Sequence, residues 1–120
     1  MADARLPRAM RICNSLDFRR VYQRRCTAGD EQLVVFGGLN GLGHPRLGLS
    51  VSRKLGGAVV RNRWKRLLRE AFRLSRGQLP AGIDLVVIPR QEVKPELASL
   101  LASLPRLAAQ VAKKLQDRPA

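Results

Sequence analysis

The sequence predicts a single small α/β domain, and three observations lead to this fold class. The 120 residues suit one domain and leave no room for a second core. Residues 46–52 alternate apolar with small or polar side chains, as a half-buried strand does, and the apolar run at 84–89 suits a strand covered on both faces. Between them, residues 58–76 follow a helical period. The expected order of elements is helix, strand, strand, helix, strand, helix.

The chain begins with a basic arm and a short helix. Residues 1–14 carry three arginines and little periodicity, which is typical of an arm, and a further strand near residues 10–13 stays an alternative. Ser15 suits the N-cap of a helix, so we expect a helix from there to about Arg25. Residues 27–30 are expected to break it.

Two strands and a loop are expected in the middle of the chain. The β-branched and apolar residues at 33–36 predict a strand. The glycine-rich residues 37–45 predict a loop. In the next strand, residues 46–52, one face is apolar and the other carries small or polar side chains, among them Gly48, Ser50 and Ser52. A face of small side chains permits close approach by a ligand.

The last part of the chain predicts a buried strand followed by a helix. After a connection at 77–82 and the strand at 84–89, Pro95 is expected as the first residue of a helix. An apolar stripe extends that helix to about Leu115. Pro105 is expected to kink or split it, because an interior proline costs about 3 kcal/mol.

The helix at 58–76 is expected to have an apolar face and a cationic face. On a helical wheel the apolar side collects Val60, Trp64, Leu67, Leu68, Ala71 and Leu74. The opposite side collects cations spaced four residues apart, namely Arg61, Lys65, Arg69 and Arg73. Like charges at this spacing repel one another. A helix lying along a phosphate backbone explains them better than a solvated face, which would normally mix charges of both signs.

The charge balance of the chain points to a polyanionic partner. There are 23 Lys+Arg and 9 Asp+Glu, which give a net charge of +14. Such a charge repels itself within a folded domain unless a polyanion neutralises it. Nucleic acid is the first candidate, and an anionic membrane surface is the second. No apolar run approaches the ~18–20 residues of a membrane span.

The sequence contains no recognisable catalytic or metal-binding constellation. Cys13 and Cys26 form neither a CxxC pair nor, with the single histidine His44, a zinc-ligand set. The acidic residues are scattered, and only Asp30 and Glu31 adjoin, so no converging carboxylates for metal-assisted hydrolysis are evident. We therefore expect a nucleic-acid-binding protein that performs no catalysis itself and holds no metal.

A long segment of the chain resembles a known family. Residues 46–70 read RLGLSVSRKLGGAVVRNRWKRLLRE, with support from DFRRVY at 17–22 and DLVVIPR at 84–90. These motifs are similar to those of the bacterial ribonuclease P protein family, in register and without a gap. They cover roughly residues 12–90. A structural RNA binder such as a small ribosomal protein, and a stand-alone nuclease, are the alternatives that composition alone leaves open.

The resemblance implies a fold and a function. The fold is an α+β sandwich with a small sheet of about four strands and three helices, in which the strand, helix and strand from residue 46 to 90 form an unusual left-handed crossover. Most such crossovers are right-handed. Catalysis belongs to an RNA subunit that uses Mg²⁺ and cuts precursor tRNA to release its 5′ leader. The protein binds ribonuclease P RNA and precursor tRNA in the cytoplasm, with no membrane and no small-molecule substrate.

The resemblance also assigns site residues within one domain that spans residues 1–120. Residues expected to bind RNA are Arg53, Lys54, Arg61, Asn62, Arg63, Lys65, Arg66 and Arg69. Those expected to line a cleft for the leader are Phe18, Tyr22, Phe36 and Ser50. Aromatic rings stack on unpaired bases, whereas cations follow phosphates. Core packing is the alternative for Phe18 and Tyr22.

Two residues depart from the family pattern. Gly57 stands where the family usually has Asn, so a side-chain contact from that turn is not expected to be kept. Trp64 replaces an aliphatic residue. Its wheel position predicts the core, and stacking at the surface is the alternative.

Overall fold

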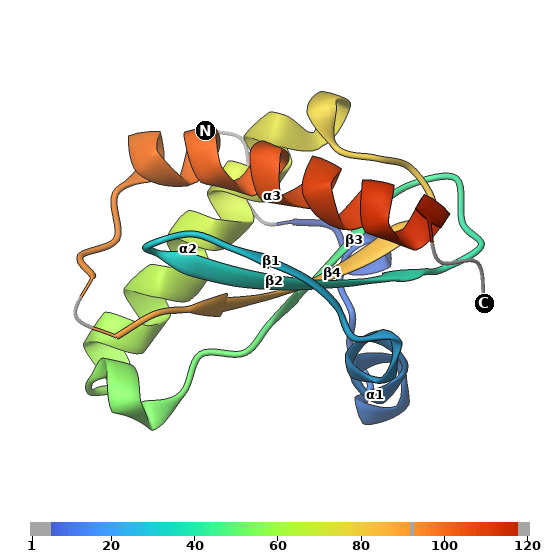
Figure 1. Ribbon diagram of the computed structural model, residues 1–120. Coiled ribbons are helices and arrows are strands. Elements are labelled where there is room, and N and C mark those ends of the chain that lie inside the picture. Colours follow the sequence, from blue (N-terminus) through green and yellow to red (C-terminus); the bar gives the residue numbers. More distant parts are fainter. Residues whose placement is uncertain (1–5, 92, 118–120) are drawn as a thin grey trace.

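The structure, a computed structural model, describes residues 6–91 and 93–117, and four strands within them form one sheet (Figure 1). Three α-helices and three short 3-10 helices are the other elements of the described residues. In chain order the elements are η1 (Arg8–Met10), α1 (Ser15–Arg24), β1 (Cys26–Gly29), β2 (Leu33–Leu39), β3 (Arg46–Leu49), η2 (Arg53–Leu55), α2 (Ala58–Ser75), η3 (Arg76–Gln78), β4 (Ile83–Pro89) and α3 (Leu97–Asp117).

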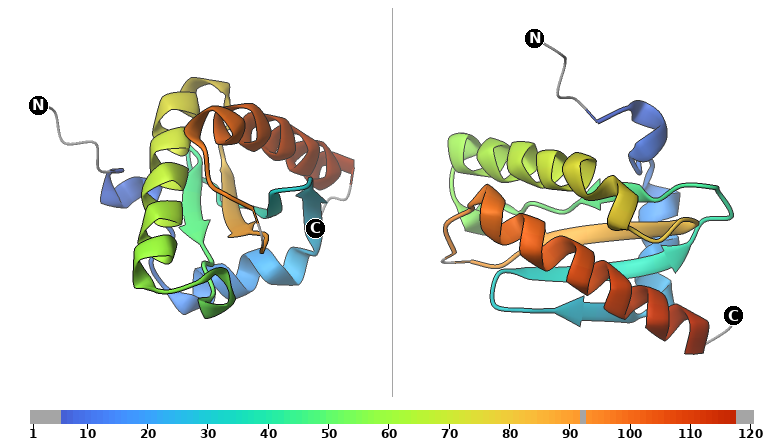
Figure 2. Two further views of the ribbon diagram at one scale, coloured as in Figure 1. Left: turned by 90° about the vertical axis from the view of Figure 1, so that its left-hand side faces the viewer. Right: turned by 90° about the horizontal axis from the view of Figure 1, so that it is seen from above.

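The strands lie in the order β1-β2-β4-β3. The β1–β2 and β2–β4 pairs are antiparallel, and β3 is parallel to β4. Helix α2 connects the two parallel strands. Seen from the face that carries α2 and α3, with both strands pointing upward, β4 lies to the left of β3 (Figure 2), so the crossover is left-handed. The left-handed crossover implied by the family resemblance is present.

Helices cover the two faces of the sheet unequally (Figure 1). On one face α2 and α3 enclose the main core, to which α2 contributes Trp64, Leu68 and Phe72, and β4 contributes Leu85 and Val87. On the other face α1 lies alone over a smaller cluster. This arrangement is the expected α+β sandwich, and it leaves part of the α1 face of the sheet accessible.

Several element boundaries differ from those predicted. Helix α1 ends at Arg24, before the predicted break at 27–30, but Cys26–Gly29 form strand β1, which was not predicted, and the turn begins at Asp30. The alternative strand near 10–13 amounts to a single bridge between Arg11 and Leu47. The half-buried strand predicted at 46–52 ends at Leu49, where the chain turns into η2.

The helix ends also differ in detail. Asn14, not Ser15, caps α1, since its side-chain oxygen accepts a hydrogen bond from the backbone N–H of Asp17 at 2.8 Å. Helix α3 begins at Leu97, so Pro95 precedes it. Pro105 lies within α3 without splitting it, because the buried leucines on both sides of the proline hold the helix against the sheet.

Candidate RNA interface

An aromatic cluster, defined here as Phe18, Tyr22 and Phe36, lies where α1 crosses the sheet. Phe18 and Tyr22 are four residues apart on α1 and so share one face of the helix. The rings of Tyr22 and Phe36 meet edge to face, with centroids 5.0 Å apart and planes at 80°. All three side chains are half-buried and pack against buried Ile12, Val21 and Val86. The cluster therefore contributes to the small core and also presents aromatic surface to solvent.

Gly48 on β3 allows Phe18 to approach the sheet closely. A Cβ atom at position 48 would lie 2.9 Å from the Phe18 ring and 3.1 Å from the side chain of Ile12. The prediction that the small face of this strand admits a ligand is therefore wrong at Gly48, because the protein's own ring fills that space. Ser50 is half-buried beyond the strand end, and its N–H donates to the carbonyl of Val87 at 3.0 Å. Ser52 is exposed and caps η2.

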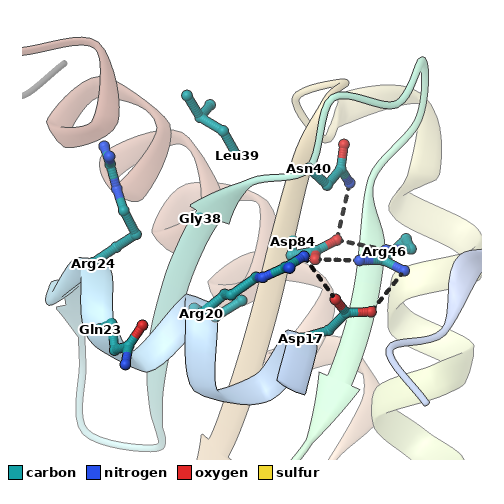
Figure 3. Close-up of a pocket in the computed structure, with 10 residues that line it drawn as sticks. Asp17, Arg20, Gln23, Arg24, Gly38, Leu39, Asn40, Arg46 and Asp84 are labelled. Atoms are coloured by element: carbon teal, nitrogen blue, oxygen red, sulfur yellow. Dashed lines mark hydrogen bonds and ion pairs between the residues drawn. The ribbon is translucent and has the colours of Figure 1, made fainter. Parts of the chain in front are cut away.

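An ion-pair network fixes the other flank of α1 to the sheet (Figure 3). Arg46 donates through Nε and a terminal nitrogen to the two carboxylate oxygens of Asp84, at 2.7 and 2.6 Å. The same guanidinium reaches Asp17 of α1 at 3.4 Å. Asn40 donates to Asp84 at 2.9 Å.

The hydrogen bonds that Arg46 donates to Asp84 outweigh burial and raise the pKa of Arg46 above its usual value. This network sets the position of α1, and with it the aromatic cluster. No local sequence pattern predicts this network. The matching charges of Asp17, Arg46 and Asp84 were visible in the sequence, but only the fold brings them together.

The cations of α2 occupy two positions on the helix. Asn62, Arg63 and Arg66 are exposed on the outer face, while Arg61, Lys65 and Arg69 are half-buried along one flank. The prediction that the second group lies opposite the apolar stripe is wrong. Each step of four residues turns the row by about 40°, so the row follows the flank of the helix. Arg73, the last of this row, pairs with Glu70.

The buried face of α2 also differs from the predicted stripe. Phe72 is fully buried, whereas Val60 and Leu74, which were expected in the core, are 40% and 51% exposed. Trp64 is 1% exposed, so its prediction as a core residue is confirmed and surface stacking is excluded. The indole anchors α2 and leaves the polar faces of the helix free for a partner.

A short basic turn precedes α2. Arg53 and Lys54 are exposed on η2, and the chain then passes through Gly56 and Gly57 to the start of the helix. Gly57 is the N-cap and provides no side-chain hydrogen bond. The backbone N–H groups at this end of α2 therefore receive no side-chain cap from that position, in agreement with the loss of contact expected where the family has Asn.

The described residues include no group of three or more His, Cys, Asp or Glu side chains that could hold a metal ion. Among the described helices, none combines the length and hydropathy needed to cross a bilayer.

Known proteins resemble this chain in sequence and in fold. The family profile described as Ribonuclease P matches residues 6–115. The ribonuclease P protein component of Escherichia coli is 44% identical over 94 residues, which are 78% of each chain. The structure of the Staphylococcus aureus RNase P protein matches with a TM-score of 0.75 at 37% identity, covering 88% of this chain and 97% of that one.

A second solved structure, that of the RNase P protein from Thermotoga maritima, matches with a TM-score of 0.75 at 34% identity, over 82% of this chain and 94% of that one. These matches decide against the small ribosomal protein and the stand-alone nuclease that composition left open. The chain belongs to the ribonuclease P protein family and is an accessory subunit of that endoribonuclease, which processes the 5′ end of tRNA.

Proposed function

We propose that two surfaces of this chain divide the recognition of RNA between them. The first, called the basic surface, binds the catalytic RNA subunit and the adjacent leader through Arg53, Lys54, Arg61, Asn62, Arg63, Lys65, Arg66 and Arg69. The second is the aromatic cluster with Ser50, which receives the 5′ leader of precursor tRNA.

The arrangement of side chains supports this division. Arg63 and Arg66 are exposed on one helix, and the outer face they occupy also carries Asn62, a suitable partner for phosphate and ribose groups. The aromatic cluster presents ring surface beside a sheet face that α1 covers only in part. Rings stack on bases without strong sequence preference, which suits a leader that differs from one tRNA to another. The half-buried T-shaped pair of Tyr22 and Phe36 is the observation that carries this proposal.

In this proposal the cleavage chemistry and its Mg²⁺ belong to the RNA subunit, and the protein supplies positive charge where phosphates crowd together. Lowering that repulsion reduces the Mg²⁺ concentration that the RNA requires. We also place the protein in the cytoplasm. Cys13 and Cys26 are both free thiols, as is usual in a reducing compartment.

Reconstitution tests the proposal directly. Purified protein and a bacterial ribonuclease P RNA are assayed separately and together on precursor tRNA over a range of Mg²⁺ concentrations. The protein alone should cleave nothing, and the mixture should release the leader at lower Mg²⁺ than the RNA alone. Cleavage at the mature 5′ end by RNA-free protein would contradict the assignment of catalysis, and an unchanged Mg²⁺ requirement would contradict the role of the basic surface.

A further inference from the structure

Helix α1 carries cations that the proposed function does not use. They are four arginines, called here the α1 arginines, namely Arg19, Arg20, Arg24 and Arg25. The dipole of a helix favours cations at its C-terminus, which accounts for Arg24 and Arg25. It does not account for Arg19 and Arg20, which lie in the middle of the helix and are exposed. The only acidic residue of α1, Asp17, lies 3.6 Å from Arg20 and also pairs with Arg46. The α1 arginines therefore keep an excess of positive charge.

A hollow of about 460 Å³ lies beside these arginines, between α1 and the end of β2 (Figure 3). Its size falls within the range of ligand-binding sites. Its charged lining consists of Arg20, Arg24, Arg46, Asp17 and Asp84. Both aspartates accept hydrogen bonds from Arg46, so three cations stand against two carboxylates. Leu39 also lines the hollow and is 66% exposed. A nucleotide uses both kinds of surface, because its phosphate meets cations while its sugar or base covers apolar side chains.

The hollow lies on the flank of α1 opposite to the aromatic cluster. Each residue turns the helix by about 100°, which places Arg20 on one flank and Phe18 on the other. Val21 lies between them and is 2% exposed. It covers Gly38 of β2, where a Cβ atom would stand 3.5 Å from the Cα of Val21. This contact closes the space beneath α1 and separates the hollow from the surface that we assign to the leader.

We propose that the α1 arginines and this hollow form a second contact for the catalytic RNA, which lays a phosphate backbone along the outer flank of α1. The inference rests on the proposed function and adds a separate surface to it. Helices α1 and α2 cover opposite faces of the sheet (Figure 1). A single RNA helix that lies along α2 therefore does not also contact α1, and the catalytic RNA approaches the protein from two sides.

Two features favour the catalytic RNA over tRNA as the partner of this surface. The net charge of +14 needs a polyanion whether or not a substrate is bound. In the proposed function the catalytic RNA stays with the protein, whereas tRNA leaves after each round of cleavage. The leader, moreover, is already assigned to the other flank of α1.

The first experiment measures binding of the full chain to a bacterial ribonuclease P RNA, without tRNA, over a range of salt concentrations. Arg19→Gln and Arg20→Gln, singly and together, should lower the log–log slope by about 0.7–0.9 for each lost phosphate contact. Arg19→Lys keeps the charge and should keep the slope. The matched control is Lys113→Gln, which removes one exposed charge from α3, on the other face of the sheet. A wild-type slope in the double variant, or an equal fall in Lys113→Gln, would overturn the inference.

A second experiment identifies the RNA that lies against α1. Cys13 is exposed and Cys26 is buried, so Arg19→Cys combined with Cys13→Ser places the reactive thiol at residue 19. A thiol-reactive photo-crosslinker attached there should join the protein to the catalytic RNA in the reconstituted holoenzyme, both with and without bound precursor tRNA. Cys13→Ser alone should give no cross-links. Cross-links confined to the precursor tRNA would overturn the inference, because the surface would then belong to the substrate.

The outcome is separable from that of the proposed function. If replacement of Arg63 and Arg66 lowers the salt slope while replacement of Arg19 and Arg20 does not, the second contact is wrong and the proposed function stands. If the wild-type mixture gives no assistance to cleavage, the proposed function itself is wrong. Melting curves show whether each variant is folded under the assay conditions, and Arg19→Lys separates the loss of charge from any disturbance of the helix.

Discussion

The ring of Tyr22 on α1 meets the ring of Phe36 on β2 edge to face, with centroids 5.0 Å apart. Such a pair contributes about 0.5–1.5 kcal/mol beyond the area it buries. Both rings stay half-exposed, so the contact that fixes α1 on the sheet also leaves aromatic surface for a ligand.

Tyr22→Ala should weaken binding of precursor tRNA by about one to two decades, since one stacked base contributes about 1–3 kcal/mol. Mature tRNA has no leader, and its affinity should scarcely change. The measurement is paired binding of both ligands to reconstituted holoenzyme, with a melting curve for each variant. Tyr22→Phe keeps the ring and should keep the affinity. Equal losses for both ligands in Tyr22→Ala would mean that Tyr22 acts only through the small core.

Gly48→Ala should destabilise the protein by about 1–3 kcal/mol, the usual cost of an added methyl in a tightly packed site. The new Cβ would stand 2.9 Å from the Phe18 ring, so the ring must move, and precursor affinity should fall together with stability. Urea unfolding and precursor binding measure the two effects. Gly43→Ala is the control, because a Cβ there meets nothing within 4 Å. Equal stability of the two variants would contradict the close contact of Phe18 with the sheet.

Asp84→Asn should cost about 3–5 kcal/mol in the free energy of unfolding, because removal of one partner leaves the other charge of a buried pair uncompensated. The side chains of Arg46 and Asp84 are 19% and 6% exposed and join at 2.6 Å. Asp17→Asn is the matched variant. Its contact with Arg46 is longer, at 3.4 Å, so its cost should be clearly smaller. The reverse order, measured by denaturant unfolding, would mean that Asp17 and not Asp84 is the main anchor of Arg46.

Asp30 should make stability depend on acid pH. Burial opposes ionisation of this carboxyl, but hydrogen bonds from Ser103 and from the N–H groups of Gln32 and Leu33, with the charge of Arg106, outweigh it and hold its pKa below the usual 3.8. The folded state therefore binds this proton more weakly than the unfolded state does. The stabilisation is complete above the unfolded pKa and disappears as the pH falls through the folded pKa.

Unfolding curves measured from neutral pH to below about pH 4 test this prediction. Asp30→Asn should be less stable at neutral pH and should lose part of the acid dependence. Glu31→Gln, at the exposed neighbouring position, should keep the wild-type slope. Parallel curves for wild type and Asp30→Asn would show that Asp30 has no depressed pKa.

Replacing Arg63 and Arg66 together with alanine should reduce the dependence of RNA binding on salt. Each lost phosphate contact lowers the log–log slope by about 0.7–0.9. Both residues are exposed, so folding should be unaffected. Lys113→Ala removes an exposed charge from α3 and should leave the slope unchanged. A wild-type slope in the double variant would mean that the outer face of α2 faces solvent and makes no phosphate contacts.

The segment from residue 46 to 76 was largely predictable because its pattern is strong. The period of the helix and the alternation of the strand placed both elements, with α2 at Ala58–Ser75. The details depend on neighbours. A helical wheel takes no account of neighbouring elements, but α2 packs against both β3 and α3, so Phe72 is buried and Val60 and Leu74 are exposed.

Strand β1 escaped prediction because nothing local specifies it. Its four residues, Cys26–Gly29, are held by antiparallel pairing with β2. The turn that allows this pairing begins at Asp30, whose side chain accepts hydrogen bonds from the N–H groups of Gln32 and Leu33, each at 2.9 Å. The hydrogen bonds that Asp30 accepts therefore favour a β-hairpin of β1 and β2 over an irregular segment after α1.

The residues of the site could largely be predicted from the sequence, whereas their positions relative to one another could not. The sequence predicted Phe18 as a cleft residue and the small face at Gly48 as open to a ligand, but the Phe18 ring itself fills the space at Gly48. It assigned Arg11 to an arm, although the fold brings this residue beside Lys65 and Arg69. Contacts between segments far apart in the chain depend on how α1 and α2 pack, which no local pattern specifies.

The bridge between Arg11 and Leu47 has a consequence for solubility. Strand β3 is at one end of the sheet, and the N–H of Ile12 donates to the carbonyl of Leu47 at 2.9 Å. The residues before α1 thus occupy hydrogen-bonding groups that an open edge strand would offer to another molecule, and open edges promote aggregation. A chain shortened to begin at Cys13 would expose this edge, and it should form oligomers through β3 at concentrations where the full chain does not.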